Sequence, residues 1–209
     1  MVKSKIRRGY RIAKYIVYKE TLVDSVENFW SFTGAFLGIG LIALLQTTLS
    51  DADNLFLIGS FGASSVLIFG AIQSPLAQPR NLVGGHIISA ILGVTIFQVF
   101  PNIIWLTAPL AVSLSILCMQ VTKTLHPPGG ATALIAVIGS EKIKHLGYWF
   151  VLSPVASGVF ILLVVALIFN NLTPRRKYST SRRFSRTFPW AAYTTKKILK
   201  RMKREAVTS

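Results

Sequence analysis

The amino-acid sequence predicts an all-α membrane protein, a polytopic bundle of about six apolar segments. Two observations point to this class. Of the 209 residues, 52% are hydrophobic and only 14% are charged, which is a composition typical of membrane proteins. In addition, Asp, Glu, Lys and Arg are absent from long stretches at 28–49, 54–79, 81–122, 124–140 and 146–174. Because about 20 apolar residues cross a hydrocarbon core, and a central charge costs about 2.5–3.5 kcal/mol, these stretches suit a bilayer.

The charge-free stretches divide into six apolar segments, near 28–49, 55–73, 83–100, 103–122, 125–140 and 147–171. Six crossings place both ends of the chain on the same side of the membrane. An alternative with four crossings, in which the second and fifth segments are re-entrant, has the same consequence. The charges in the connecting loops do not separate the two alternatives.

Basic residues are concentrated at the two ends of the chain, where 19 of the 23 Lys and Arg lie in 1–19 or 174–209. Lys and Arg close to membrane spans remain in the cytoplasm, so we expect a multi-pass protein of the cell membrane with both termini cytoplasmic. Arg80 and Lys123 then lie inside, as the positive-inside rule requires, whereas the lysines between the fifth and sixth segments oppose it.

Three regions are expected: a basic interfacial segment at 1–27, the transmembrane domain at 28–172 and a basic cytoplasmic tail at 173–209. In both terminal regions apolar residues recur at helical spacing among basic ones, which is typical of helices that lie on a membrane surface. We expect these regions to bind anionic headgroups of the lipid bilayer, at about 1 kcal/mol for each basic residue near the surface. Nucleic acid is the weaker alternative, because headgroups are already within reach. The stretch 174–187, rich in Ser, Thr and Arg, predicts a solvated linker.

The second and fifth segments resemble each other. The sequence Gly-Ala-Ser-Ser that begins at Gly62 corresponds to Gly-Ala-Thr-Ala that begins at Gly130, 68 residues later. A shift by this distance superimposes the first span on the fourth and the third on the sixth, which predicts an inverted 3+3 repeat. Many secondary transporters build a midplane binding site from inverted repeats with short, interrupted segments. The alternative is that Gly-Ala-Ser/Thr sequences are common wherever helices pack.

The fifth segment opens with two prolines and two glycines, at 127–130. Such a sequence cannot continue a helix but can begin one, because proline is tolerated at the first helical position. A helix from Gly129 to Gly139 is about 17 Å long, against a hydrocarbon thickness of about 30 Å, so a broken or half helix is predicted. Its first amides and the positive end of its dipole could bind an anion. Alternatively, the prolines form a bend whose amides are satisfied by neighbouring helices or water.

Side chains near this start could donate to the same anion. His86 and His126 could each donate to an anion, relay a proton or cap backbone carbonyls. No carboxylate accompanies these two histidines in the apolar segments. Hydroxyl donors are expected from the fifth segment and from the matching second segment. The candidate substrate-binding residues are His126, Gly129, Gly130, Thr132, Gly62, Ser64, Ser65, His86 and Arg80.

Several other classes of site are not expected. The single cysteine, Cys118, excludes an intrachain disulfide and a cysteine metal cluster. A Ser-His-Asp set, an HExxH motif and a phosphate-binding loop are absent from the sequence, so we expect no enzyme, no cofactor and no metal. Gly34 and Gly38 have GxxxG spacing, which indicates either a homo-oligomer face or packing within one chain.

The stretch His-Pro-Pro-Gly-Gly-Ala-Thr at 126–132 resembles the signature of the HPP family of integral membrane proteins. The stretches 60–69 and 78–86 match the same pattern, and the three together cover most of the membrane body. Some members, from cyanobacteria and chloroplasts, are implicated in nitrite transport, so the resemblance implies a small anion as substrate, with nitrite first. Many relatives carry a C-terminal pair of nucleotide-sensing CBS modules. The basic tail cannot replace them, so the resemblance does not imply regulation by adenine nucleotides for this chain.

Two functions follow from these observations. The first is a membrane transporter or channel for a small inorganic anion, with nitrite as the leading candidate. The alternative is a membrane scaffold that transports nothing and uses its basic tail to recruit anionic lipids or partners. Ion flux in liposomes separates the two.

Overall fold

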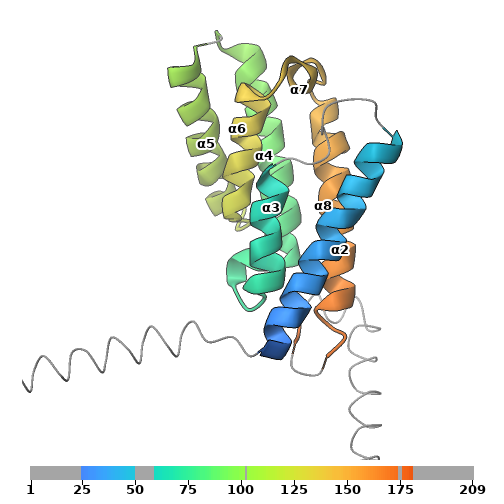
Figure 1. The fold of residues 1–209 in the computed structure, drawn as a ribbon. Coiled ribbons are helices and arrows are strands. Elements are labelled where there is room, and N and C mark those ends of the chain that lie inside the picture. Colours follow the sequence, from blue (N-terminus) through green and yellow to red (C-terminus); the bar gives the residue numbers. More distant parts are fainter. Residues whose placement is uncertain (1–24, 50–58, 102, 174–175, 181–209) are drawn as a thin grey trace, which may run out of the picture.

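The computed structural model describes residues 25–49, 59–101, 103–173 and 176–180. In these ranges the regular elements are all helices, without a strand, and the helices form a bundle (Figure 1). The predicted all-α class is therefore confirmed for the described residues. The sequence proposed two basic terminal segments, 1–27 and 173–209. Residues 1–24 of the first and 181–209 of the second lie outside the described ranges.

Among the described residues, four helices are long and apolar enough to cross a membrane. They are α2 (Ser25–Leu49), α4 (Pro79–Val99), α5 (Ile104–Val121) and the continuous pair formed by a π-helical turn, η3 (Val151–Ala156), and α8 (Ser157–Phe169). They correspond to the first, third, fourth and sixth predicted segments. α4 begins four residues earlier than predicted, because Pro79 occupies its first turn with a backbone angle already suited to a helix.

The second and fifth predicted segments form short helices. α3 (Gly59–Ser65) has seven residues and continues into a five-residue π-helical turn, η1 (Val66–Gly70). α6 (Pro127–Ile138) has 12 residues and begins at the double proline, as predicted. At 1.5 Å per residue each unit is about 18 Å long, far below the hydrocarbon thickness of about 30 Å.

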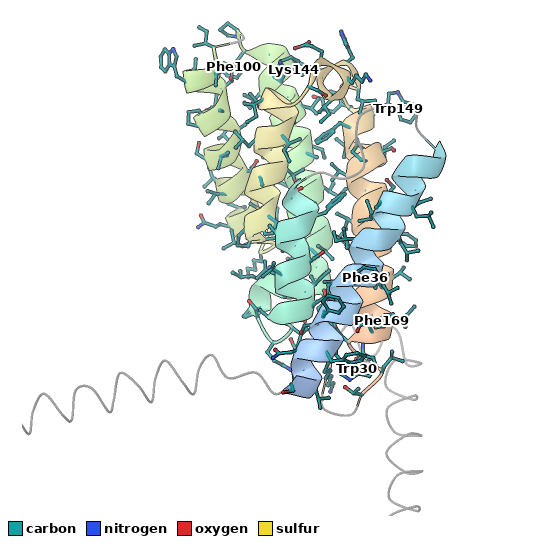
Figure 2. All side chains as sticks on the ribbon, viewed as in Figure 1. Trp30, Phe36, Phe100, Lys144, Trp149 and Phe169 are labelled. Carbon is teal, nitrogen blue, oxygen red and sulfur yellow. The ribbon has the colours of Figure 1, made fainter. Side chains whose placement is uncertain are left out.

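The outer surface of the bundle is apolar. Phe32 and Phe36 on α2, Trp105 on α5 and Phe160 on α8 are each about two-thirds exposed or more. Aromatic side chains also gather at both ends, with Trp149 at the end that carries Lys144 and Trp30 beside Phe169 at the opposite end (Figure 2). Apolar sides with aromatic ends are the surface expected of a protein embedded in a bilayer.

The chain runs in alternating directions along the bundle. Figure 1 shows α2, α4 and α6 pointing one way and α3, α5 and α8 the other. Arg176 lies 3.5 Å from the carboxylate of Glu27, so the beginning of α2 and the chain beyond α8 meet at one end. Arg80 donates to the carbonyl of Thr122 at 2.5 Å, which joins the start of α4 to the end of α5. We call this the Arg176 end; the short helix α7 (Glu141–His145) caps the opposite end (Figure 1).

α4 and α6 pack more extensively than any other pair of described helices. Their contact is made by small residues spaced four apart, Gly85, Ser89 and Gly93 on α4 and Gly129 and Ala133 on α6. A Cβ atom added at Gly85 would lie 2.5 Å from Cβ of His126, and one added at Gly93 would lie 2.6 Å from the Ala133 carbonyl oxygen. The two backbones therefore touch, as small-residue motifs allow in membranes.

The GxxxG pair of α2 is used inside the chain. A Cβ atom at Gly34 would lie 2.5 Å from Cδ1 of Phe69, and one at Gly38 would lie 3.2 Å from Cδ2 of Leu162. The Phe69 ring thus occupies the space that the two glycines leave. Of the two interpretations of this motif, the structure supports packing within one chain.

The predicted solvated linker at 174–187 is wrong for Arg176, Tyr178 and Ser179, whereas Lys177 and Thr180 between and after them are exposed. Arg176 and Tyr178 are each only 2% exposed. Arg176 donates to the carbonyl of Phe69 at 2.5 Å, and the Tyr178 hydroxyl donates to the carbonyl of Ala77 at 2.6 Å. The physical reason is that helix ends leave carbonyls without intrahelical donors. Phe69 lies at the buried end of η1, where the Ser31 hydroxyl also donates to it, and Ala77 ends the short 3-10 turn η2 (Pro75–Ala77).

Candidate functional site

Four polar side chains meet inside the bundle. Ser64 comes from α3, His86 from α4, His126 from the residue that precedes α6, and Thr132 from α6. The Ser64 hydroxyl oxygen lies 2.7 Å from Nε2 of His86 and 2.9 Å from Nε2 of His126. Nδ1 of His86 lies 2.7 Å from the Thr132 hydroxyl. All four residues have zero exposed surface, so the cluster is closed to solvent.

One hydrogen-bond pattern satisfies this cluster when both imidazoles are neutral. Nδ1 of His126 lies 2.8 Å from the carbonyl oxygen of Leu76, which can only accept, so Nδ1 is the donor. Nε2 of His126 must then accept from Ser64, and Ser64 in turn accepts from Nε2 of His86. Nδ1 of His86 is left to accept from Thr132. The donors therefore point along one chain, from Thr132 through His86, Ser64 and His126 to Leu76.

The cluster lies deep in the bundle but not at its centre. His86 is the eighth residue of α4, a helix of 21 residues. At 1.5 Å per residue it lies about 10 Å from the start of a helix about 31 Å long. The site is thus about one-third of the way along α4 from the Arg176 end.

The surroundings of the two imidazoles are apolar. The Phe61 ring packs edge-on against His86 with centroids 5.6 Å apart, and the two imidazole centroids are 5.0 Å apart. Within the part of the chain that the structure describes, no group of three or more His, Cys, Asp and Glu side chains could hold a metal ion. The arrangement can exchange protons and donate hydrogen bonds to a small guest, provided the cluster opens.

The start of α6 does not supply the backbone donors that the sequence analysis expected. Pro127 and Pro128 have no N–H, and the N–H of Gly129 donates to the carbonyl of His126 at 2.8 Å. The same prolines that allow the helix to begin here remove its first donors. An anion at this position would therefore be bound by side chains.

Other predicted site residues lie away from the cluster. Gly130 faces α5, where an added Cβ atom would make ordinary contact with Val112 at 3.7 Å, and Gly62 faces open space. Arg80 is exposed and bonded at the Arg176 end. Ser65 is buried without a hydrogen-bond partner among the described residues. Gly129 contributes by its close approach to α4, where an added Cβ atom would lie 2.8 Å from the carbonyl oxygen of Gly85.

The loop 71–78 was missed as part of the site. It provides the Leu76 carbonyl that holds His126, and it is itself held by hydrogen bonds. The Gln78 side chain donates to the carbonyl of Ser74 at 2.9 Å and accepts from the N–H of Thr180 at 2.9 Å. Any residue type can supply a backbone carbonyl, so the sequence gives no sign of the Leu76 acceptor. Gln78, which lies in the stretch 78–86 that resembles the family pattern, was the one residue of this loop that could have indicated its role.

A cavity of about 510 Å³ lies between α5 and α6, apart from the histidine cluster. Its lining is almost wholly apolar and includes Val112, Ile116, Met119, Leu125, Gly130 and Leu134. Gln120 is the polar side chain in that lining. Such a surface does not suit an inorganic anion.

Comparisons with known proteins agree with the membrane architecture. Residues 20–179 match the transmembrane region of the HPP family, a range that includes the described helices and the buried Arg176 and Tyr178. Two proteins of Dictyostelium discoideum, each named a transmembrane protein, are 48% and 47% identical to this chain over 159 residues. The matches cover 74% of this chain but 51% and 55% of those proteins, so the chain spans about half the length of the curated relatives it matches. No solved structure matches. The fold, the spans and the family match identify this chain as an integral membrane protein that belongs to the HPP family.

Proposed function

We propose that this protein transports a small inorganic anion across the membrane, with nitrite as the first candidate. The observation that supports the proposal is the fully buried cluster of Ser64, His86, His126 and Thr132. Polar and ionisable groups inside a membrane are costly, and they typically mark the path of a substrate or ion. Nitrite itself is suggested by the family resemblance; the geometry supports a small guest that accepts hydrogen bonds.

The two short helices support an inverted 3+3 arrangement. Each half has the order long, short, long: α2, α3 and α4, then α5, α6 and α8, and corresponding helices point in opposite directions (Figure 1). Ser64 and Thr132 are 68 residues apart, the same interval that separates Gly62 from Gly130. Equivalent hydroxyls of the two proposed halves thus bond to the two nitrogens of one imidazole, His86. This convergence is what a site shared between repeats requires.

The six-crossing topology can be tested by cysteine labelling. Ala77 lies near the Arg176 end, because the Tyr178 hydroxyl bonds to its carbonyl, whereas Lys142 lies on α7 at the other end. In intact cells, we expect a membrane-impermeant maleimide to reach Lys142→Cys from outside and to reach Gln73→Cys, which is exposed in the same loop as the buried Ala77, only from the cytoplasm. External labelling of both positions would instead support re-entrant second and fifth segments.

Transport requires the cluster to open, since its four residues have no exposed surface. The α4–α6 contact is a backbone contact and cannot separate without losing its packing. Loop 71–78 is attached through a few hydrogen bonds. We infer that the site opens at the Arg176 end by displacement of this loop, in the manner of a gate in alternating access.

The decisive comparison is with a scaffold that transports nothing. Purified protein in liposomes is expected to take up nitrite above the rate of vesicles without protein, and to discriminate among nitrite, nitrate, formate and chloride. A scaffold would show no flux of any of these anions, while its tail would bind anionic vesicles in a salt-dependent way. That pair of results would replace the transport proposal with the scaffold alternative.

A further inference from the structure

We propose that anion transport is coupled to a proton: the Ser64-bridged imidazoles of His86 and His126 bind one proton, and it crosses the membrane with one monovalent anion. This coupling rests on the transport proposed above and names the ion that accompanies the substrate.

The first argument concerns charge. Along α3, η1, α5, α6 and Val151–Phe169 the sequence has no Asp, Glu, Lys or Arg. On α4 the charged residue is Arg80, which is bonded to the Thr122 carbonyl at the Arg176 end, and on α2 it is Glu27, beside Arg176 at that end. Within these described helices, an anion desolvated beside the cluster therefore has the two imidazoles as its possible cationic partners. An isolated buried charge is far more costly than a neutral pair.

The second argument concerns room for the proton. Nδ1 of His86 can take a proton if the Thr132 hydroxyl changes from donor to acceptor. The hydroxyl hydrogen of Thr132 can then turn to the carbonyl of Pro128, 3.4 Å away. His86 would donate from both ring nitrogens, and the Ser64 to His126 bond would remain. The cluster can thus hold an added proton without an unpaired donor.

The same geometry limits the number of protons to one. A proton on Nε2 of His126 would point at the Ser64 oxygen, which already accepts a hydrogen bond from His86. The Ser64 hydroxyl would also lose its acceptor, because it donates its own hydrogen to the same Nε2 of His126. Two imidazolium rings would also repel each other at a centroid distance of 5.0 Å in an apolar site. One proton balances one monovalent anion, so the transported pair carries no net charge.

Electroneutral transport has a distinct signature. A free anion would follow the membrane potential, and 100 mV corresponds to an accumulation of about 50-fold. A proton with an anion would ignore the potential and follow the pH gradient. Liposomes with potassium and valinomycin set the potential, and buffers set the pH difference independently. Protein-free vesicles correct for nitrous acid that crosses the lipid unaided.

The matched variants are Thr132→Val and Thr132→Ser. Valine keeps the volume but removes the hydroxyl that must accept from protonated His86, so stimulation by an acidic exterior should be lost. Serine keeps the hydroxyl and should keep the stimulation. Equal stimulation in the two variants, with both folded, would contradict the assignment of the proton to His86.

A second measurement does not require transport. In nanodiscs, the ring nitrogens of ¹⁵N-labelled histidine should show Nδ1 of His86 gaining the proton during a pH titration, while His126 keeps its neutral pattern with Nδ1 protonated. His145, which is exposed on α7, gives a separate reference signal. Protonation of His126 at Nε2, or no change in His86 while the protein stays folded, would overturn this assignment of the proton.

The two measurements distinguish the two levels of the proposal. Nitrite uptake by the intact protein is expected to rise several-fold with an acidic exterior and to stay unchanged when the potential is stepped by 100 mV. Uptake that follows the potential and ignores the pH gradient would overturn proton coupling while leaving anion transport in place. An absence of protein-dependent uptake would overturn the transport proposal and proton coupling with it. Titration of His86 would then preserve only the proton site.

Discussion

The α4–α6 contact and the Arg176 end hold the same histidine cluster in different ways. Between α4 and α6 the backbones touch through glycines, so a single added methyl group would collide with main-chain or Cβ atoms. At the Arg176 end, loop 71–78 and residues 176–180 are joined by hydrogen bonds, because the Tyr178 hydroxyl donates to the Ala77 carbonyl and the Thr180 N–H donates to the Gln78 side chain. Backbone packing is fixed by shape, whereas hydrogen bonds can exchange partners with water. The difference indicates a rigid frame on one side of the site and a releasable cover on the other.

The largest effect is expected when the frame is overpacked. In Gly129→Ala the new Cβ atom would lie 2.8 Å from the carbonyl of Gly85 and 2.9 Å from the Ser89 hydroxyl. We expect a loss of about 1–3 kcal/mol in stability, as for other overpacked interiors. Thermal unfolding in detergent, followed by tryptophan fluorescence, measures this as a lower Tm.

The neighbouring residue is the matched control. In Gly130→Ala the new Cβ atom has open space up to Val112 at 3.7 Å, and alanine is the better helix former by about 0.5–1 kcal/mol. We therefore expect an equal or higher Tm. Equal losses at the two positions would show that the α4–α6 contact is not the tight frame described.

A smaller and more local effect is expected at the cover. Tyr178→Phe removes the hydroxyl that donates to the carbonyl of Ala77. One such bond contributes about 0.5–1.5 kcal/mol, so amides of loop 71–78 should exchange with deuterium about 2- to 13-fold faster. Amides of α6 should keep their rates, because the frame is unchanged. Faster exchange spread evenly over both regions would erase the distinction between frame and cover.

The smallest effect is expected at α7, on the surface at the end opposite the Arg176 end. Lys144 donates to Glu141 at 2.9 Å, and this bond lowers the pKa of the exposed Glu141 carboxyl. Such a group stabilises the fold above its unfolded pKa, and the contribution is lost as the pH falls through the folded value. Because the pair is exposed and screened by solvent, we expect Glu141→Gln to leave the Tm and its pH dependence unchanged within error. A clear drop in Tm at neutral pH would assign α7 a structural role.

The sequence was sufficient for features that depend on neighbouring residues. Charge-free runs located the spans, and the double proline located the start and short length of α6. The meeting of Ser64 with His126 and Thr132 with His86 followed in part from matching the second and fifth segments. These signals are local, or repeat within the chain, so one sequence carries them.

The rest depended on contacts between distant residues. Arg176 reaches Phe69 across 107 positions, and its composition-based assignment to a solvated linker ignored the buried carbonyls that it satisfies. The Leu76 carbonyl has no side-chain signature at all. The backbone anion site at α6 is a different error, because Pro127 and Pro128 visibly lack the N–H groups that it needed.

The central claim, that the histidine cluster is the anion site, is tested most directly by comparing Ser64→Ala with Ser113→Ala in proteoliposomes. Ser64 bridges the two imidazoles, whereas Ser113 is exposed on α5 and bonds only the local carbonyl of Leu110. A hydrogen bond to a charged group contributes about 1.5–3 kcal/mol, so nitrite uptake below saturation should fall about 10- to 150-fold in Ser64→Ala. Ser113→Ala should match the unmodified protein. Uptake by Ser64→Ala that equals uptake by Ser113→Ala, with both proteins folded, would contradict the account.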